Sequence, residues 1–399
     1  MNINLIEIKS LTEAQYELER INCDPMGVHI LKPKSVFKII KIENIRSKAA
    51  NLLKQTFLGK GGDVAVSRYS ADLSEELTDV LIFATVKQYW LALTQLKIQP
   101  WGLAKLAVQI EEILKKSDQL PMREYKWKDR NLTISRETSL VMGILNITPD
   151  SFSDGGKYND LDLAIQRVEE LQVDGADIID IGAESTRPYK GAEKISAEQE
   201  IERLLPLLEA VMPYCKVPVS IDTYKASVAK AALECGAHMI NDIWGLQYDA
   251  DMVGVVAQYD VPIVVMHNKN EISYPNGIMN DINNFLRKSI DIGIEYGIKR
   301  ENIIIDPGIG FAKTVEQNLY IMSKLEQLQV LGCPVLLGTS RKRFIGEVLD
   351  LPVSDRVEGT IATAALGKMK GVQIHRVHDV KQVKRTLKMM DAMMGSGER

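Results

Sequence analysis

Short apolar runs alternate with longer amphipathic stretches from about residue 138 to the end of the chain. The runs are rich in β-branched residues, and the longer stretches carry apolar residues at helical spacing. The apolar runs are Leu140–Leu145, Asp177–Ile181, Val217–Ile221, His238–Ile243, Val261–Met266, Asn302–Ile305, Pro334–Leu337 and Gly371–Ile374. The helical stretches are Leu161–Val173, Ala197–Val211, Ser227–Glu234, Asp281–Tyr296, Val315–Gln329, Val357–Lys368 and Val380–Met394.

Strands that alternate with helices form parallel sheets with right-handed crossovers. Eight such units within residues 138–399 have the size of a (β/α)8 TIM barrel, so the pattern predicts an α/β fold of this kind. An open, doubly wound sheet is the alternative, but the even spacing of the units favours a closed barrel.

Residues 1–120 follow a different pattern and predict a smaller N-terminal α+β domain. We expect strands at Phe37–Ile42 and Asp63–Tyr69, and helices at Ile45–Leu58, Glu75–Leu96 and Leu103–Lys116. Residues 121–137 are polar and charged and begin with Pro121, so they are interpreted as a linker between the two domains.

Composition narrows the class of protein. The net charge is only −4, and both signs of charge are mixed along the chain, which argues against a nucleic-acid partner. Four cysteines lie far apart without zinc-ligand spacing, as in a reduced cytoplasmic protein. The N-terminus has no signal-peptide pattern, and no apolar run is long enough to cross a membrane. We therefore expect a cytoplasmic protein.

Polar side chains able to do chemistry follow all eight apolar runs. They include Asn146, Glu184, Asp222, Asn241, His267, Asp306, Ser340, Lys342, Arg376 and His378. A barrel brings the carboxyl ends of its strands to one face, where the active sites of this fold lie. The sequence therefore predicts an active site at this face.

Asp222, Asn241 and Asp306 stand directly behind β-branched runs, where an unpaired polar group would be costly. A flat ligand with several N–H donors, such as the amino-pyrimidinone edge of a pterin, would satisfy them. The alternative is that they cap helices or pair with Lys342 and Arg376.

Cations at the last two strand ends predict an anion site. Ser340-Arg341-Lys342-Arg343 joins a hydroxyl and three cations at a strand-to-helix turn. Arg376 and His378 lie two residues apart and would face the same side of an extended chain. The alternative for the run from Ser340 to Arg343 is a solvated basic cap of the helix.

His267 follows the fifth apolar run, and a lone histidine at such a place is more often structural.

Seven motifs together resemble the dihydropteroate synthases of the pterin-binding enzyme family. In order they are Met142–Gly156, Gly182–Pro188, Ile221–Thr223, Asn241–Ile243, Asp306–Phe311, Ser340–Lys342 and Arg376–His378. The resemblance covers roughly residues 138–395, and the N-terminal part is similar to an extension found on some bacterial members.

The resemblance implies an enzyme that condenses 6-hydroxymethyl-7,8-dihydropterin pyrophosphate with p-aminobenzoate in folate biosynthesis, and that is a target of sulfonamides. It implies that Asp222, Asn241, Asp306 and Lys342 hold the pterin, that Arg376 and His378 bind the leaving group, and that Asn146 helps bind Mg²⁺. It places Phe152, Asp154, Thr186, Arg187 and Pro188 on mobile loops over the aminobenzoate, with Ser340 and Phe311 beside it. Catalysis would fall to Lys342, Arg376, His378 and Asp222, and a homodimer is expected.

The sequence departs from the family pattern at two places. Tyr189-Lys190 follows Pro188 where glycine is usual, and Ala312 stands where glycine is frequent. Two other functions remain open: a methyltransferase-type barrel that also holds a pterin, which would have no use for a pyrophosphate clamp, and a pterin-binding protein without catalytic activity.

Overall fold

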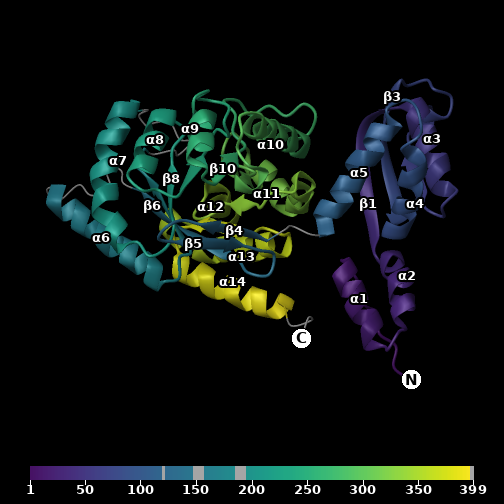
Figure 1. Ribbon diagram of the computed structural model, residues 1–399, viewed down its shortest axis with the longest axis horizontal. Coiled ribbons are helices and arrows are strands. Elements are labelled where there is room, and N and C mark those ends of the chain that lie inside the picture. Colours follow the sequence, from purple (N-terminus) through teal and green to yellow (C-terminus); the bar gives the residue numbers. More distant parts are fainter. Residues whose placement is uncertain (119–121, 147–156, 185–194, 396–399) are drawn as a thin grey trace. The chain divides into compact units, whose positions relative to one another are not determined.

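The computed structural model describes residues 1–118, 122–146, 157–184 and 195–395 (Figure 1). The chain divides into two compact units with the boundary between residues 119 and 120. Neither unit contains, among its described residues, a helix long and apolar enough to cross a membrane.

The first unit is an α+β fold. Its antiparallel sheet has the order β1-β3-β2, with β1 at Phe37–Arg46, β2 at Asp63–Val66 and β3 at Leu77–Thr85. Its helices are α1 (Leu11–Arg20), α2 (Pro25–Ser35), α3 (Ser47–Leu58), α4 (Val86–Leu96) and α5 (Leu103–Asp118). Side chains of the sheet and of α3, α4 and α5 share one core, which includes Leu53, Phe57, Ile82 and Tyr89.

The predicted helix Glu75–Leu96 is wrong in its first half. Residues Leu77–Thr85 form the central strand of the sheet, and only Val86–Leu96 is helical. Thr78, Val80, Ile82 and Ala84 are buried in alternation, which is the period of a strand. Thr85 then caps the helix within a capping box that includes Gln88, so the change from strand to helix occurs at that residue. Helices α1 and α2 were not predicted.

The second unit is a closed eight-stranded parallel barrel, which confirms the predicted fold class. Its strands are β6 (Leu140–Asn146), β7 (Ile178–Gly182), β8 (Val219–Asp222), β9 (Met239–Asp242), β10 (Ile263–Met266), β11 (Ile303–Asp306), β12 (Leu336–Leu337) and β13 (Ile374–Val377). They follow one another in the order β11-β10-β9-β8-β7-β6-β13-β12, and a bridge between Ile305 and Val335 joins the two ends. The last strand begins three residues later than the prediction Gly371–Ile374 because Gly371 is in a turn.

Helices surround the barrel on its outside (Figure 1). They are α6 (Lys157–Val173), α7 (Ala197–Val211), α8 (Ala226–Glu234), α9 (Met252–Tyr259), α10 (Ile278–Glu295), α11 (Val315–Ser323), α12 (Arg343–Leu349), α13 (Val357–Met369) and α14 (Val380–Gly395). Their apolar faces and the outward side chains of the strands form one large core. The short helices α9 and α12 were not predicted.

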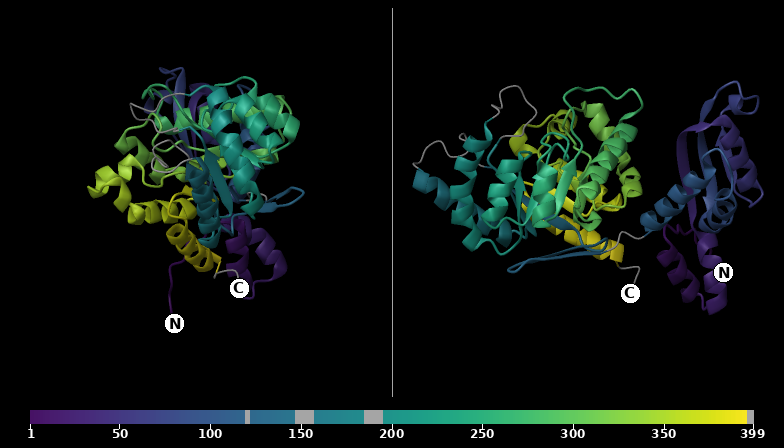
Figure 2. Two further views of the ribbon diagram at one scale, coloured as in Figure 1. Left: turned by 90° about the vertical axis from the view of Figure 1, so that its left-hand side faces the viewer. Right: turned by 45° about the horizontal axis from the view of Figure 1, so that its top comes forward.

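Residues 121–137 are not a linker, because most of them form a β-hairpin of the second unit. Strands β4 (Arg123–Lys126) and β5 (Asn131–Ile134) pair in antiparallel fashion. Tyr125, Leu132 and Ile134 share a core with the inward residues at the amino ends of the barrel strands, so the hairpin closes that end of the barrel. The right-hand view of Figure 2 shows the hairpin beneath the barrel, beside α14. Its polar composition reflects its outward face together with the buried Arg123.

Candidate active site

Five polar side chains, which we call the polar cluster, meet inside the barrel toward the carboxyl ends of neighbouring strands. Arg376 of β13 lies between two carboxylates: its Nε donates to Asp180 Oδ2 at 2.5 Å and its Nη2 donates to Asp222 Oδ2 at 2.7 Å. Asn241 of β9 donates through Nδ2 to the same Asp180 oxygen at 3.1 Å. Asn146, the last residue of β6, lies beside them. Its Oδ1 and the Cβ of Asp222 flank Gly182, since a Cβ added to this glycine would be 3.4 Å from each of them.

Burial and charge shift the protonation of this group. Burial raises the pKa of Asp222 to about 7, although Arg376 counteracts the rise. Burial would lower the pKa of Arg376, but the charges of Asp180 and Asp222 outweigh it and the pKa is raised. The pairing of Asp222 with Arg376, which the sequence left open as the alternative to a ligand, is present. It does not exclude a ligand, because Asp222 Oδ1 has no partner among the described residues.

Asp306 and Lys342 form the other side of the site. Asp306 Oδ1 accepts from the Gly308 N–H at 2.7 Å, and burial raises the pKa of this carboxyl group. Lys342 Nζ donates to the Ile309 carbonyl and lies 4.7 Å from the centre of the Phe311 ring. Burial lowers the pKa of Lys342 to about 8, against the opposing effect of Asp306.

Two glycines allow this arrangement after β11. Gly308 has φ +67°, and a Cβ there would be 1.9 Å from the His267 carbonyl oxygen. Gly310 has φ +84°, and a Cβ there would be 2.9 Å from Lys342 Cδ. Any side chain at either position would displace the loop or the lysine, which explains the glycines of the Asp306–Phe311 motif.

The predicted cluster of three cations is divided among different partners. Arg341 forms a two-pronged ion pair with Asp379, and Arg343 pairs with Glu347 on its own helix. Only Lys342 of the three lies beside Asp306. Ser340 Oγ accepts from the His378 N–H at 3.1 Å and lies 3.1 Å from His378 Nδ1. Arg376 and His378 therefore have different partners in this structure.

His267 belongs to a buried support beneath the loop that carries Phe311. Its Nδ1 lies 2.9 Å from Lys313 Nζ, and its Nε2 lies 3.0 Å from Asp281 Oδ1. Lys313 also donates to the carbonyls of Gly308 and Phe311 at 2.8 and 2.9 Å. Burial lowers the pKa of His267 to about 3, so the ring is neutral and accepts from the lysine. His267 therefore helps to hold Lys313 and, through it, the loop that follows β11.

Sequence reasoning missed two residues of this region, Asp180 and Lys313. Asp180 is a single carboxylate within the apolar run of β7 and is completely buried. That position is the signal that could have identified it, because a buried charge needs partners. Lys313 gave no such signal, since lysines in loops are common. Phe152, Asp154, Thr186, Arg187 and Pro188 lie outside the described residues.

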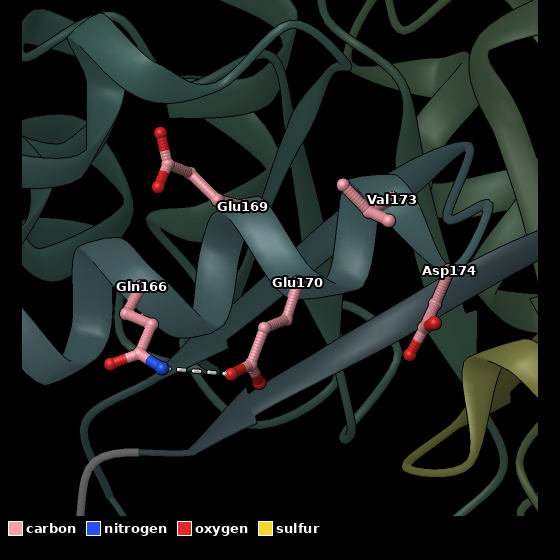
Figure 3. A pocket seen from close by; sticks show the side chains of 5 residues that line it. All are labelled: Gln166, Glu169, Glu170, Val173 and Asp174. Carbon is pink, nitrogen blue, oxygen red and sulfur yellow. Dashed lines mark hydrogen bonds between the residues drawn. The ribbon is translucent and has the colours of Figure 1, made fainter.

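A separate shallow hollow lies on the outer surface of α6 (Figure 3). Gln166, Glu169, Glu170, Val173 and Asp174 line it, and Gln166 donates to Glu170 at 3.1 Å. It lies toward the carboxyl end of this helix, away from the strand ends that carry the polar cluster, and its polar lining consists of three carboxylates and one amide.

Comparison with known proteins identifies the family. The model of the pterin binding enzyme family matches residues 142–378, which is more than half of the chain. The chain belongs to this family. The match begins in β6 and ends directly after β13, so it spans the strand ends that form the polar cluster.

Relatives differ in how much of the chain they share. A dihydropteroate synthase of Bacillus subtilis is 56% identical over 262 residues, which are 66% of this chain and 91% of the relative. A solved dihydropteroate synthase from Xanthomonas albilineans with 4-aminobenzoic acid has a TM-score of 0.65 and 36% identity, over 69% of this chain and 99% of that one. A probable bifunctional folylpolyglutamate synthase/dihydropteroate synthase of Halobacterium salinarum is 36% identical over 382 residues, 94% of this chain and 45% of the relative. The last alignment therefore extends into the N-terminal unit.

Proposed function

We propose that the barrel condenses 6-hydroxymethyl-7,8-dihydropterin pyrophosphate with p-aminobenzoate, giving 7,8-dihydropteroate and pyrophosphate in folate biosynthesis. The observation that carries the proposal is the set of acceptors and cations at one end of the barrel. Asp222, Asn241 and Asp306 offer oxygens to a ligand with several N–H donors, and Arg376 and Lys342 are cations beside them. The similarity to named dihydropteroate synthases supports the same reaction.

In this reaction the aniline nitrogen attacks the exocyclic methylene carbon of the pterin. A C–N bond forms, the C–O bond to pyrophosphate breaks, both electrons leave with pyrophosphate, and the nitrogen loses a proton to solvent. An aniline needs no strong base, so the residues act by binding and orienting the reactants and by stabilising the departing charge. Asp222, Asn241, Asp306 and Lys342 hold the pterin, while Arg376 and His378 receive the pyrophosphate.

The aminobenzoate side is assigned to Phe311 and Ser340 together with Phe152, Asp154, Thr186, Arg187 and Pro188. Phe311 presents its ring below the Lys342 ammonium, and Ser340 lies beside His378. An aromatic ring and a hydroxyl group are suited to an aryl amine that carries a carboxylate.

Mg²⁺ is proposed as the metal, with Asn146 as its protein ligand. Mg²⁺ commonly keeps several waters and binds through substrate phosphates with only one or two protein oxygens. Asn146 supplies one such oxygen next to Asp222, and the described residues contain no group of three or more His, Cys, Asp or Glu that could hold a metal alone. When bound, the ion would neutralise charge on the pyrophosphate.

Two broader properties are also proposed. A cytoplasmic location is consistent with four cysteines that are all free thiols in the structure. A homodimer is supported by exposed apolar side chains on the neighbouring helices α11 and α12. These are Leu319, Tyr320, Val348 and Leu349.

The test is an assay of the full chain with dihydropterin pyrophosphate, p-aminobenzoate and Mg²⁺, in which dihydropteroate and pyrophosphate are both measured. Asp306→Ala should abolish measurable pterin binding, because it removes a buried acceptor and leaves Lys342 without its carboxylate. Arg343→Ala is the control, since Arg343 is exposed on the helix surface and, among the described residues, forms its ion pair with Glu347. Unchanged pterin affinity in Asp306→Ala would contradict the proposal.

A further inference from the structure

Asp180 has an environment that stability alone does not explain. It lies in the middle of β7 with no exposed surface, and it is the only carboxylate in the run Ile178–Gly182. Its Oδ2 accepts from Asn241 Nδ2 at 3.1 Å and from Arg376 Nε at 2.5 Å. Its Oδ1 has no partner among the described residues.

A buried carboxylate is a poor way to stabilise a barrel. Removing the charge from water is costly, and well-packed apolar residues of similar volume are often at least as stabilising as a buried ion pair. Both hydrogen bonds of Asp180 go to side chains of the candidate active site, Asn241 and Arg376. What the carboxylate provides is therefore the orientation of these two groups.

The bond to Asn241 decides which end of its amide faces a ligand. Because Nδ2 donates to Asp180, the amide atom left to meet a ligand is the acceptor Oδ1. With Asp222 and Asp306, the site then presents oxygen acceptors from three strands, β8, β9 and β11. Turned the other way, the amide would place N–H donors against the N–H donors of a pterin.

The bond to Arg376 fixes the guanidinium plane. Asp180 holds Nε and Asp222 holds Nη2, so the plane is set by two carboxylates on adjacent strands. The Nη1 amino group is then the part of the fork that can meet an anion. Without Asp180 the side chain would keep one of these two anchors and could rotate about it.

We propose that Asp180 is a positioning residue that fixes Asn241 as an acceptor toward the pterin and Arg376 as a donor toward the pyrophosphate. The inference rests on the proposed function. It adds a residue that need not touch either substrate and acts through two that do.

The first experiment compares variants of the full chain. Asp180→Ala should weaken binding of 6-hydroxymethylpterin about tenfold, measured by calorimetry. The reason is that Asn241 loses its hydrogen bond to the carboxylate and its amide is free to turn. Binding of the pyrophosphate ester should weaken further, because Arg376 also loses an anchor, while the KM for p-aminobenzoate stays near that of the wild type. Asp180→Asn keeps an acceptor oxygen and should restore most of the pterin affinity.

Asp177→Ala is the matched control on the same strand segment. Asp177 accepts from Lys384 at 2.6 and 2.8 Å and from the Val141 N–H at 2.7 Å, at the amino end of β7. Its loss should lower the melting temperature but leave pterin affinity unchanged. Equal effects of Asp177→Ala and Asp180→Ala on pterin affinity would overturn the proposal, because Asp180 would then act only through stability.

An exchange of groups tests the proposal even where Asp180→Ala does not fold. Asn241→Asp places two carboxylates face to face and should reduce pterin affinity strongly. In the double variant Asp180→Asn with Asn241→Asp, the amide introduced on β7 can donate to the carboxylate introduced on β9 and still accept from Arg376. Pterin affinity should then recover at least about tenfold over Asn241→Asp alone. No recovery would contradict the proposal. A wild-type chain that binds no pterin would instead contradict the proposed function itself.

Discussion

Ala312 shows how a single residue can carry backbone strain next to the site. Its φ is +46°, in the left-handed region that disfavours residues with a Cβ. Its carbonyl accepts from the Tyr274 hydroxyl at 2.7 Å, and the next residue is the buried Lys313. The departure from the glycine that is frequent here in the family is therefore accompanied by two anchors that hold the strained conformation.

Ala312→Gly should stabilise the barrel by about 0.5–1 kcal/mol, because glycine removes the Cβ penalty and only part of this gain is lost to its greater freedom in the unfolded chain. Urea unfolding of the two proteins measures the difference. Ala364→Gly is the control: Ala364 is buried within α13, where glycine should destabilise by roughly 1 kcal/mol or more. Destabilisation by both changes would show that the backbone at Ala312 is not strained.

The protonation of Asp222 and Lys342 should limit the pH range of activity. In the proposed function, pterin binding needs an ionised Asp222, whose pKa burial raises to about 7, and a charged Lys342, whose pKa burial lowers to about 8. The value of kcat/KM for the pterin substrate should therefore rise as pH increases through about 7 and fall above about 8. A pH profile of kcat/KM measures both limits.

Lys342→Arg separates the two limits, because an arginine stays charged throughout this range. Its maximal rate should be lower, since the fork cannot follow the path of Lys342 past Gly310, but the decline at high pH should disappear. A decline that persists unchanged in this variant would show that Lys342 does not set the alkaline limit.

At the scale of elements, the sequence predicted the barrel well because each of its strands is short, apolar and buried on both faces. The positions of the strand ends along the sequence also predicted that Asp222, Asn241, Asp306 and Arg376 would lie at one face of the barrel, as they do. The pairing of Asp222 with Arg376 was among the alternatives that the sequence left open, but the bond from Arg376 to Asp180 was missed, because Asp180 lies within an apolar run and not at its end. Periodicity determines which face a residue occupies but not which neighbour it meets.

The hairpin β4–β5 was missed for a different reason. Its sequence is charged, and a buried arginine is indistinguishable in sequence from an exposed one. Arg123 donates through Nη1 to the carbonyls of Arg300, Glu301 and Ile303, and through Nη2 to that of Gly332. These carbonyls precede or begin barrel strands, so one cation satisfies backbone groups that the closed end of the barrel would otherwise leave unpaired.

At the scale of the whole molecule, each unit has hydrophobic cores of its own. Those of the first unit consist of residues between Ile8 and Leu114, and those of the barrel unit begin at Tyr125. The Bacillus subtilis relative matches 66% of this chain over 91% of its own length, which indicates that a barrel of this family needs no N-terminal unit. Every described residue of the polar cluster also comes from the barrel.

A protein that begins at Leu120 should therefore fold and keep kcat/KM within a few-fold of the full chain. Calorimetry of the full chain should show two unfolding transitions, and pterin should raise the temperature of only one of them. A second truncation beginning at Thr138 is the control. It removes the hairpin, and with it the four hydrogen bonds of Arg123 and the buried side chains of Tyr125, Leu132 and Ile134. Each apolar side chain lost accounts for about 1.5–3 kcal/mol, so this protein should melt at a much lower temperature or fail to fold. If both truncated proteins lost activity equally, the N-terminal unit, and not the hairpin, would be what the barrel requires.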